Sequence, residues 1–212
     1  MSSDDNTRHL ETACQPCEEG LRACETSAMV TPLLNQGGFL DMLHQEIDWV
    51  ARSGESSLLL MLQPDHLDHQ VLEPQPTQAV MGIAQTLCRS LRTQDHVGLI
   101  HPQVFGVVLH DCHADEGLEV AQRLHQSVQA VRTSEATEGL TASMGAAFAP
   151  LWVRSEVSVW MSRALTQLMA AQSRGGNCLC VDSRYLSALS THDAAQHYLS
   201  ASTIEFRPSG LH

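Results

Sequence analysis

The sequence predicts an α+β fold in which helices pack on one mixed β-sheet. Three observations support this prediction. Apolar patterns typical of helices and strands follow in the order helix, strand, helix, strand, strand, helix, strand, helix, strand. A continuous apolar run at 57–62 has the length of a strand that is buried on both faces. Two further apolar runs, 96–100 and 104–109, are separated by a short break and indicate a hairpin.

The first half of this order starts with a helix over about 39–51, where apolar residues recur at helical spacing. The buried strand at 57–62 follows it. Residues 64–76 contain three prolines and several polar residues, which indicates a loop. A second helix is expected over about 77–92, because its apolar residues fall on one face.

The second half continues after the hairpin with a helix over about 115–131. A strand is expected at 140–148. The next helix begins at residue 152 or 157 and ends at 173, where the Arg-Gly-Gly-Asn segment at 174–177 stops it. A short final strand is expected at 178–181, and the mixed composition beyond it predicts no particular element.

The chain has 212 residues, which is enough for one α/β domain with short extensions. We expect a polar, cysteine-containing N-terminal tail or helix at 1–28, one domain at 29–182 and a C-terminal extension at 183–212. With 43% hydrophobic residues the domain can bury a core, although only 4% of the residues are aromatic.

The charge balance restricts the possible partners. The formal net charge is −12, and this argues against nucleic-acid and anionic-membrane binding, because such partners require a basic surface. All twelve basic residues are arginine, which excludes mechanisms that need a lysine ammonium. No apolar run is long enough to predict a membrane span, and no secretory signal is recognisable. Seven cysteines, an odd number, favour reduced thiols and a cytoplasmic protein.

Several short motifs occur in the order and spacing of a known family. They are Val30-Thr-Pro-Leu-Leu-Asn35 with Phe39-Leu40, the strand Leu58–Asp65, the hairpin His101–Phe105, Ala142-Ser-Met-Gly-Ala146, and Gly175-Gly-Asn177. Together they resemble the GGDEF domain of diguanylate cyclases over about residues 30–181. The resemblance implies a nucleotidyl-cyclase-like mixed sheet with a ferredoxin-like βαββαβ core, flanked by helices.

The same resemblance implies a degenerate catalytic site. Diguanylate cyclases join two GTP molecules with two metal ions, which need hard carboxylate ligands. At the matching positions, Gln63 stands in place of the first acid and Gln172 in place of a late lysine. His101 and Pro102 stand in place of the signature glycines, and Gln103 and Val104 in place of the signature acids. Phe105 is the same residue as in the family. Asp65 and Asp68 lie nearby, but loop carboxylates are more often solvated than metal-bound. We therefore expect no cyclase activity and no Mg²⁺.

Many family members have a second, inhibitory site for the product, with the motif Arg-x-x-Asp five residues before the hairpin. Arg92 and Asp95 match this motif and spacing, and Arg123 matches a further family arginine, eighteen residues after Phe105. An arginine can bind the O6 and N7 edge of guanine or a phosphate, and Asp95 can accept from guanine N1–H and N2–H. We expect these three side chains to converge beside the hairpin, in a site that is open to water and wide enough for a guanine, and to bind cyclic di-GMP.

The resulting hypothesis is a non-catalytic cyclic di-GMP receptor that signals to a protein partner, in bacterial biofilm, polysaccharide or motility control. In this family the ligand often bridges two domains, so a ligand-dependent homodimer is expected. The alternative is a ligand-independent interaction scaffold, in which Arg92 and Asp95 are an ordinary ion pair worth about 0–1 kcal/mol and Arg123 is a helix-surface residue. A cyclase with unusual ligands is a third reading.

Cysteine and histidine give weaker signals. The N-terminal set His9, Cys14, Cys17 and Cys24 could bind zinc, but the spacing favours a tail with reduced thiols. The segment 110–113, His-Asp-Cys-His, is interpreted as a loop, although its residue types suit a metal.

Cys178 and Cys180 flank one residue of the last expected strand and therefore point to one face. We interpret them as small buried hydrophobic residues, which is the usual environment of free cysteines.

Overall fold

The computed structural model describes residues 32–65, 78–132, 140–149, 156–182 and 203–206. The helices are α2 (Gln36–Ser53), α3 (Gln78–Ser90), α4 (Ala114–Gln129) and α5 (Val157–Ser173). The strands are β1 (Leu33–Leu34), β2 (Leu58–Pro64), β3 (His96–His101), β4 (Val104–Leu109), β5 (Ala142–Phe148), β6 (Leu179–Asp182) and β7 (Thr203–Phe206). No helix in these ranges is long and apolar enough to cross a membrane.

The strands form one mixed seven-stranded sheet in the order β1-β3-β4-β2-β5-β6-β7. Strand β2 lies in the middle and is antiparallel to both β4 and β5, whereas β5 and β6 are parallel. The hairpin β3–β4 is antiparallel. The segment from β2 to β5 therefore has the order βαββαβ, and the expected α+β fold with a ferredoxin-like core is confirmed.

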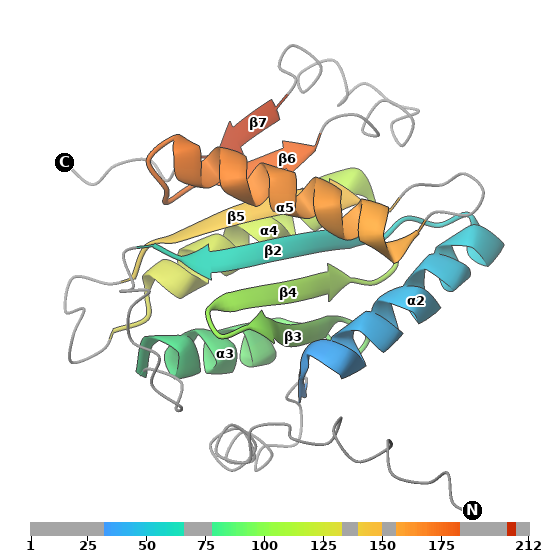
Figure 1. Ribbon diagram of the computed structural model, residues 1–212, viewed down its shortest axis with the longest axis horizontal. Coiled ribbons are helices and arrows are strands. Elements are labelled where there is room, and N and C mark those ends of the chain that lie inside the picture. The colour runs from blue at the N-terminus through green and yellow to red at the C-terminus, as the bar shows by residue number, and fades with distance from the viewer. Residues whose placement is uncertain (1–31, 66–77, 133–139, 150–155, 183–202, 207–212) are drawn as a thin grey trace, which may run out of the picture.

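The helices cover both faces of the sheet, as Figure 1 shows: α2 and α5 lie on the near face, and α3 and α4 lie behind it. Strand β2 is apolar from Leu58 to Leu62 because it contributes to both layers. Leu58, Leu60 and Leu62 pack in the α3/α4 core, whereas Leu59 and Met61 pack in the α2/α5 core.

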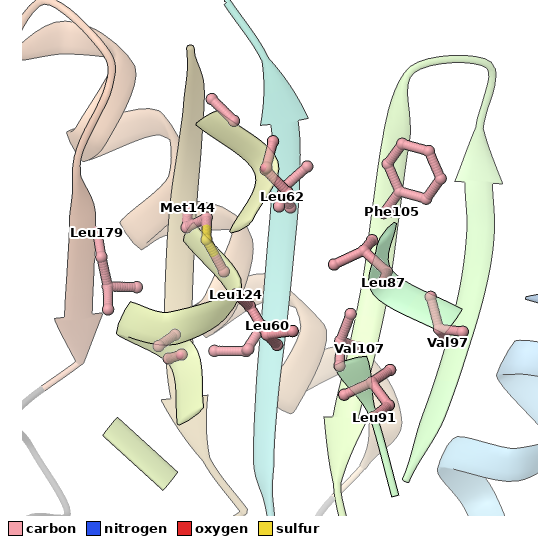
Figure 2. Packing of buried hydrophobic residues seen from close by; sticks show 14 of the residues in the cluster. Leu60, Leu62, Leu87, Leu91, Val97, Phe105, Val107, Leu124, Met144 and Leu179 are labelled. Carbon is pink, nitrogen blue, oxygen red and sulfur yellow. The ribbon is translucent and has the colours of Figure 1, made fainter. Parts of the chain in front are cut away.

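The α3/α4 core is shown from close by in Figure 2, which includes Leu87 of α3 and Leu124 of α4. These side chains pack with Leu60, Phe105 and Val107 from the central strands. All five side chains are fully buried. This core holds α3 and α4 side by side. The first site described in the next subsection lies where these two helices are neighbours.

Helix α5 lies very close to β5 at Gly145. A Cβ atom there would come within 2.1 Å of the backbone nitrogen of Leu168 and 2.2 Å of the carbonyl oxygen of Ala164, so only glycine fits. The indole Nε1 of Trp160 also donates to the carbonyl of Ala147 at 2.7 Å. These contacts hold α5 closely against β5.

Each element predicted from the sequence is present, with ends that differ by a few residues. The predictions missed β1, which has two residues, and β7, which pairs antiparallel with β6. Strand β7 lies in the predicted C-terminal extension, so part of that extension joins the sheet.

Candidate functional site

The turn between α3 and β3 holds two of the predicted ligand-binding residues. Arg92 is exposed, whereas Asp95 is only 5% exposed. The backbone N–H of Asp95 donates to the carbonyl of Arg92 at 3.0 Å. The Asp95 carboxylate accepts from the backbone N–H of Arg92 at 2.9 Å and from that of His110 at 3.2 Å. Asp95 therefore stabilises the turn and ties it to the end of β4.

The third predicted residue, Arg123, lies on α4 and is exposed. Its Nη2 donates to the carbonyl of Ser90 at 3.4 Å, at the C-terminal end of α3. A cation is favoured there because the last carbonyls of a helix carry partial negative charge. This contact brings Arg123 next to the Arg92 turn. We call Arg92, Asp95 and Arg123 the arginine corner.

A cavity of about 10 Å³ opens at the arginine corner, between Arg92, Asp95, His110, Glu116 and Val120. This volume corresponds to roughly one water molecule and cannot enclose a guanine base. The expectation that Asp95 is open to water was wrong, because its carboxylate is turned inward to two backbone amides. A large ligand at this corner would lie on the outer surface formed by the arginines.

The expected position of this corner beside the signature hairpin was also wrong. Asp95 precedes the first residue of β3, and the turn at Pro102 follows the last. The six residues of β3 separate the two, and they span about 20 Å at 3.3 Å per residue. The arginine corner and the hairpin turn therefore lie at opposite ends of the same strand.

The hairpin turn exposes His101 and Pro102. Gln103 is partly buried, and its Oε1 is enclosed without a hydrogen-bond partner among the described residues. Val104 packs against the α2/α5 core, and Phe105 is fully buried in the α3/α4 core. The two residues at the acidic signature positions therefore face protein more than solvent.

Gln63 and Gln172 meet at the same end of the sheet. The Nε2 of Gln172, at the end of α5, donates to the Oε1 of Gln63, at the end of β2, at 2.9 Å. The structure thus brings together two residues that the resemblance had placed in one site. We call Gln63, Gln172 and the turn residues 101–104 the signature corner. In the described part of the chain, no group of three or more His, Cys, Asp or Glu side chains could hold a metal ion.

Asp65 lies just beyond the signature corner and makes two internal hydrogen bonds. Its carboxylate accepts from the hydroxyl of Ser143 at 2.7 Å and from the backbone N–H of Asn177 at 2.8 Å. Asn177 has a positive φ of 51°, after two glycines that also have positive φ. Asp65 therefore stabilises the left-handed turn between α5 and β6. Asp68 lies outside the described residues.

Below this turn, His125 of α4 is 4% exposed. Its Nε2 lies 2.8 Å from the carbonyl of Ala142, which requires a proton on that nitrogen. The side chain of Gln129 lies beside it and donates to the Oδ1 of Asn177 at 2.6 Å. Burial lowers the pKa of His125 below 6.5, and the bond to Ala142 and the charge of Asp65 offset this only in part.

Sequence reasoning missed a polar cluster beneath α2. Glu46 is 5% exposed, accepts from the hydroxyl of Ser57, and lies 2.9 Å from the Nδ1 of His110. The ring of His110 also lies 4.2 Å from that of Trp49. Burial lowers the pKa of His96, although the carboxylates of Glu46 and Asp95 act in the opposite direction. The sequence did contain a signal for this buried cluster, because Glu46 lies on the apolar face of the first predicted helix.

The segment 110–113 is a loop, as expected. Asp111 has a positive φ of 46°, and His113 is the exposed N-cap of α4. Burial raises the pKa of Cys112 to about 12, so its thiol stays protonated and is a poor metal ligand. Cys178 and Cys180 are fully buried, which confirms their interpretation as small hydrophobic residues. The set His9, Cys14, Cys17 and Cys24 lies outside the described residues.

Residues 29–178 match the family model described as "Diguanylate cyclase, GGDEF domain". The chain belongs to the GGDEF family. The match covers the sheet from β1 to β5 and all four described helices, and it includes both the arginine corner and the signature corner. A search among curated proteins found no match.

Solved GGDEF structures share the fold. The GGDEF domain of DgcB from Caulobacter crescentus, in complex with c-di-GMP, is 19% identical with a TM-score of 0.61, over 74% of this chain and 95% of that one. The active GGEEF domain of a diguanylate cyclase from Vibrio cholerae is 14% identical with a TM-score of 0.63, over 70% and 97%.

A third similar structure is the diguanylate cyclase SiaD from Pseudomonas aeruginosa in complex with its activator SiaC. It is 22% identical with a TM-score of 0.63, over 77% of this chain and 64% of that one. The chain thus spans less than two thirds of the SiaD chain. At these identities the likeness establishes the GGDEF fold, and the activities of the relatives do not transfer with it.

Proposed function

We propose that this GGDEF domain is a non-catalytic receptor for cyclic di-GMP, which binds at the arginine corner. The observation that carries this proposal is the presence of two exposed arginines, Arg92 and Arg123, at the C-terminal end of α3. The contact between Arg123 and the Ser90 carbonyl joins the two elements that supply them. This cationic spot lies on a chain with a formal net charge of −12.

The ligand chemistry suits the corner. Cyclic di-GMP has two phosphodiester groups and two guanines, and an arginine fork can bind a phosphate or the guanine O6 and N7 edge. Each oxygen of the Asp95 carboxylate accepts one backbone N–H and retains a second lone pair. Because the cavity is small, we expect a guanine to stack on the outer face of an arginine guanidinium group. Only the edge of the guanine would then contact the Asp95 carboxylate.

The absence of catalysis is the second part of the proposal. Gln63 and Gln172 are neutral amides that satisfy each other, and Gln103 and Val104 provide no carboxylate for a metal ion. Asp65, the nearest acid in the described region, is already held by Ser143 and Asn177. We therefore propose that neither Mg²⁺ nor GTP chemistry is supported at this corner.

Isothermal titration calorimetry with cyclic di-GMP tests the receptor function on the full chain. We expect binding by the wild type and at least tenfold weaker binding by Arg92→Ala. Arg132→Ala is a control, because Arg132 is also exposed and, like Arg123, donates to a helix carbonyl, that of Gln129, at 2.9 Å. No heat of binding in the wild type, or equal loss in the control, would remove the proposal. Size-exclusion chromatography with light scattering tests the expected ligand-dependent homodimer.

The inward position of the Asp95 carboxylate favours a second candidate, a scaffold that binds a protein partner without a nucleotide. In that case Asp95 only stabilises the turn, and the arginines are surface charges. The two candidates differ in one measurement, because the scaffold binds its partner equally with and without cyclic di-GMP. The solved complex of SiaD with SiaC shows a GGDEF relative together with a protein partner.

A further inference from the structure

Helices α2 and α5 lie on the face of the sheet away from α3 and α4 (Figure 1). Residues of both helices line a groove between them. Its volume is about 650 Å³, which is far larger than the cavity at the arginine corner. Leu40 and Ile47 of α2, with Val157 and Met161 of α5, provide its apolar surface. All four also pack against the α2/α5 core, so the groove is a continuation of that core to the surface.

Helix α5, which contributes to this groove, exposes no charged side chain between Val157 and Ser173. The charged residue within α5 is Arg163, which is 5% exposed and donates to the Asp182 carboxylate at 2.8 Å. Val159 and Met169 of this helix are 47% and 67% exposed. Helix α4, of similar length, exposes several charged side chains, namely Asp115, Glu116, Glu119 and Arg123. Since 17% of the chain is charged, the lack of charge on α5 indicates a surface that another molecule covers.

The rim of the groove is acidic. Asp48 and Glu156 line it and are exposed, and its lining residues in the described part of the chain include no arginine. This charge argues against occupants from the chain itself. Residues 1–28 contain six acids and two arginines, and a second copy has a net charge of −12. An apolar segment with lysine or arginine beside its apolar side chains is complementary to both the surface and the rim.

We propose that the groove between α2 and α5 is the docking site for a basic amphipathic helix of another protein. Two neighbouring helices form a channel in which a third helix can lay its apolar face, with anchors at three- or four-residue spacing. The basic side chains of the partner would lie over Asp48 and Glu156. This inference does not depend on cyclic di-GMP, because the arginine corner lies on the opposite face of the sheet, at α3 and α4.

The test uses a fluorescein-labelled synthetic helix of eighteen residues, with leucines on one face and lysines beside them. Its twin has glutamates in place of the lysines. Fluorescence anisotropy with the full chain should show binding of the lysine peptide and at least tenfold weaker binding of the twin. Met161→Asp should abolish binding, and Asp48→Arg should weaken it at least fivefold. Glu119→Arg makes the same charge change on α4 and should leave binding unchanged.

Failure of the lysine peptide to bind, or equal binding of both peptides, would overturn the proposal. Circular dichroism melting checks that the variants are folded. If Met161→Asp unfolds the protein, Asp48→Arg still tests the proposal, because Asp48 is exposed and its substitution should leave the fold intact. A photo-reactive benzoylphenylalanine in place of His44, which also lines the groove, identifies the occupant. A cross-link to the peptide supports the proposal. A cross-link to the same chain, or to a second copy that the peptide does not displace, contradicts it.

Discussion

The two ends of strand β3 differ in chemistry although they belong to one sheet. At its start, the arginine corner presents Arg92 and Arg123 to solvent beside a buried carboxylate. At its end, the signature corner contains no carboxylate, and Gln63 is bonded to Gln172. Because a six-residue strand separates the corners, charge can be kept at one and lost at the other without changing the fold. Under the proposed function, cyclic di-GMP binding at the arginine corner is therefore physically separable from catalysis at the signature corner.

The largest expected effect concerns ligand binding at the arginine corner. Combined Arg92→Ala and Arg123→Ala should weaken cyclic di-GMP binding at least a hundredfold, because both charge-assisted contacts are lost. Gln172→Ala at the signature corner should leave binding unchanged. Calorimetry measures both. If the Gln172 variant binds as weakly as the double variant, the ligand uses the signature corner, and the separation between the corners fails.

The next prediction compares Asp95 with Asp65, the carboxylates next to the two corners. Each accepts two hydrogen bonds, so each alanine variant leaves two donors without their carboxylate partner. We expect Asp95→Ala and Asp65→Ala each to lower the free energy of unfolding by about 2–3 kcal/mol in urea titrations. Only Asp95→Ala should also weaken ligand binding. Unchanged binding by Asp95→Ala would assign Asp95 a purely structural role.

A smaller effect is expected on the pH dependence of stability. Burial lowers the pKa of both His125 and His96, so the unfolded chain binds more protons than the native state below about pH 6.5. Stability should be fully present above that pH and should fall as the pH decreases below it. The His125→Gln variant has no imidazole to protonate at this position. In urea titrations its free energy of unfolding should therefore decrease less between pH 7 and pH 5 than that of the wild type. An equal decrease would show that His125 is not a source of the pH dependence.

The smallest expected effect is on GTP chemistry. The wild type incubated with GTP and Mg²⁺ or Mn²⁺ should form no cyclic di-GMP. Gln63→Asp should not produce activity, because it leaves Gln103 and Val104 at the two signature positions where acids are expected. Chromatography of the nucleotides measures this. Product formation by the wild type would show that the signature corner is catalytic after all.

The sequence by itself determined the order of the elements and the fold class. Helical and strand periodicity are local properties, so the run from Leu58 to Leu62 was sufficient to predict a strand buried on both faces. The motif around Arg92 and the spacing to Arg123 were likewise readable along the chain. Strands β1 and β7 were not, because a two-residue strand and an edge strand are defined by their pairing partners.

Only the tertiary structure decided how the polar side chains are used. Asp95 turns inward to an amide fifteen residues away, Glu46 meets His110 across 64 residues, and Asp65 holds an amide 112 residues away. Such partners are chosen by the packing of helices on the sheet, and no local pattern encodes them. For the same reason, the groove between α2 and α5 exists only once two helices far apart in the sequence lie side by side.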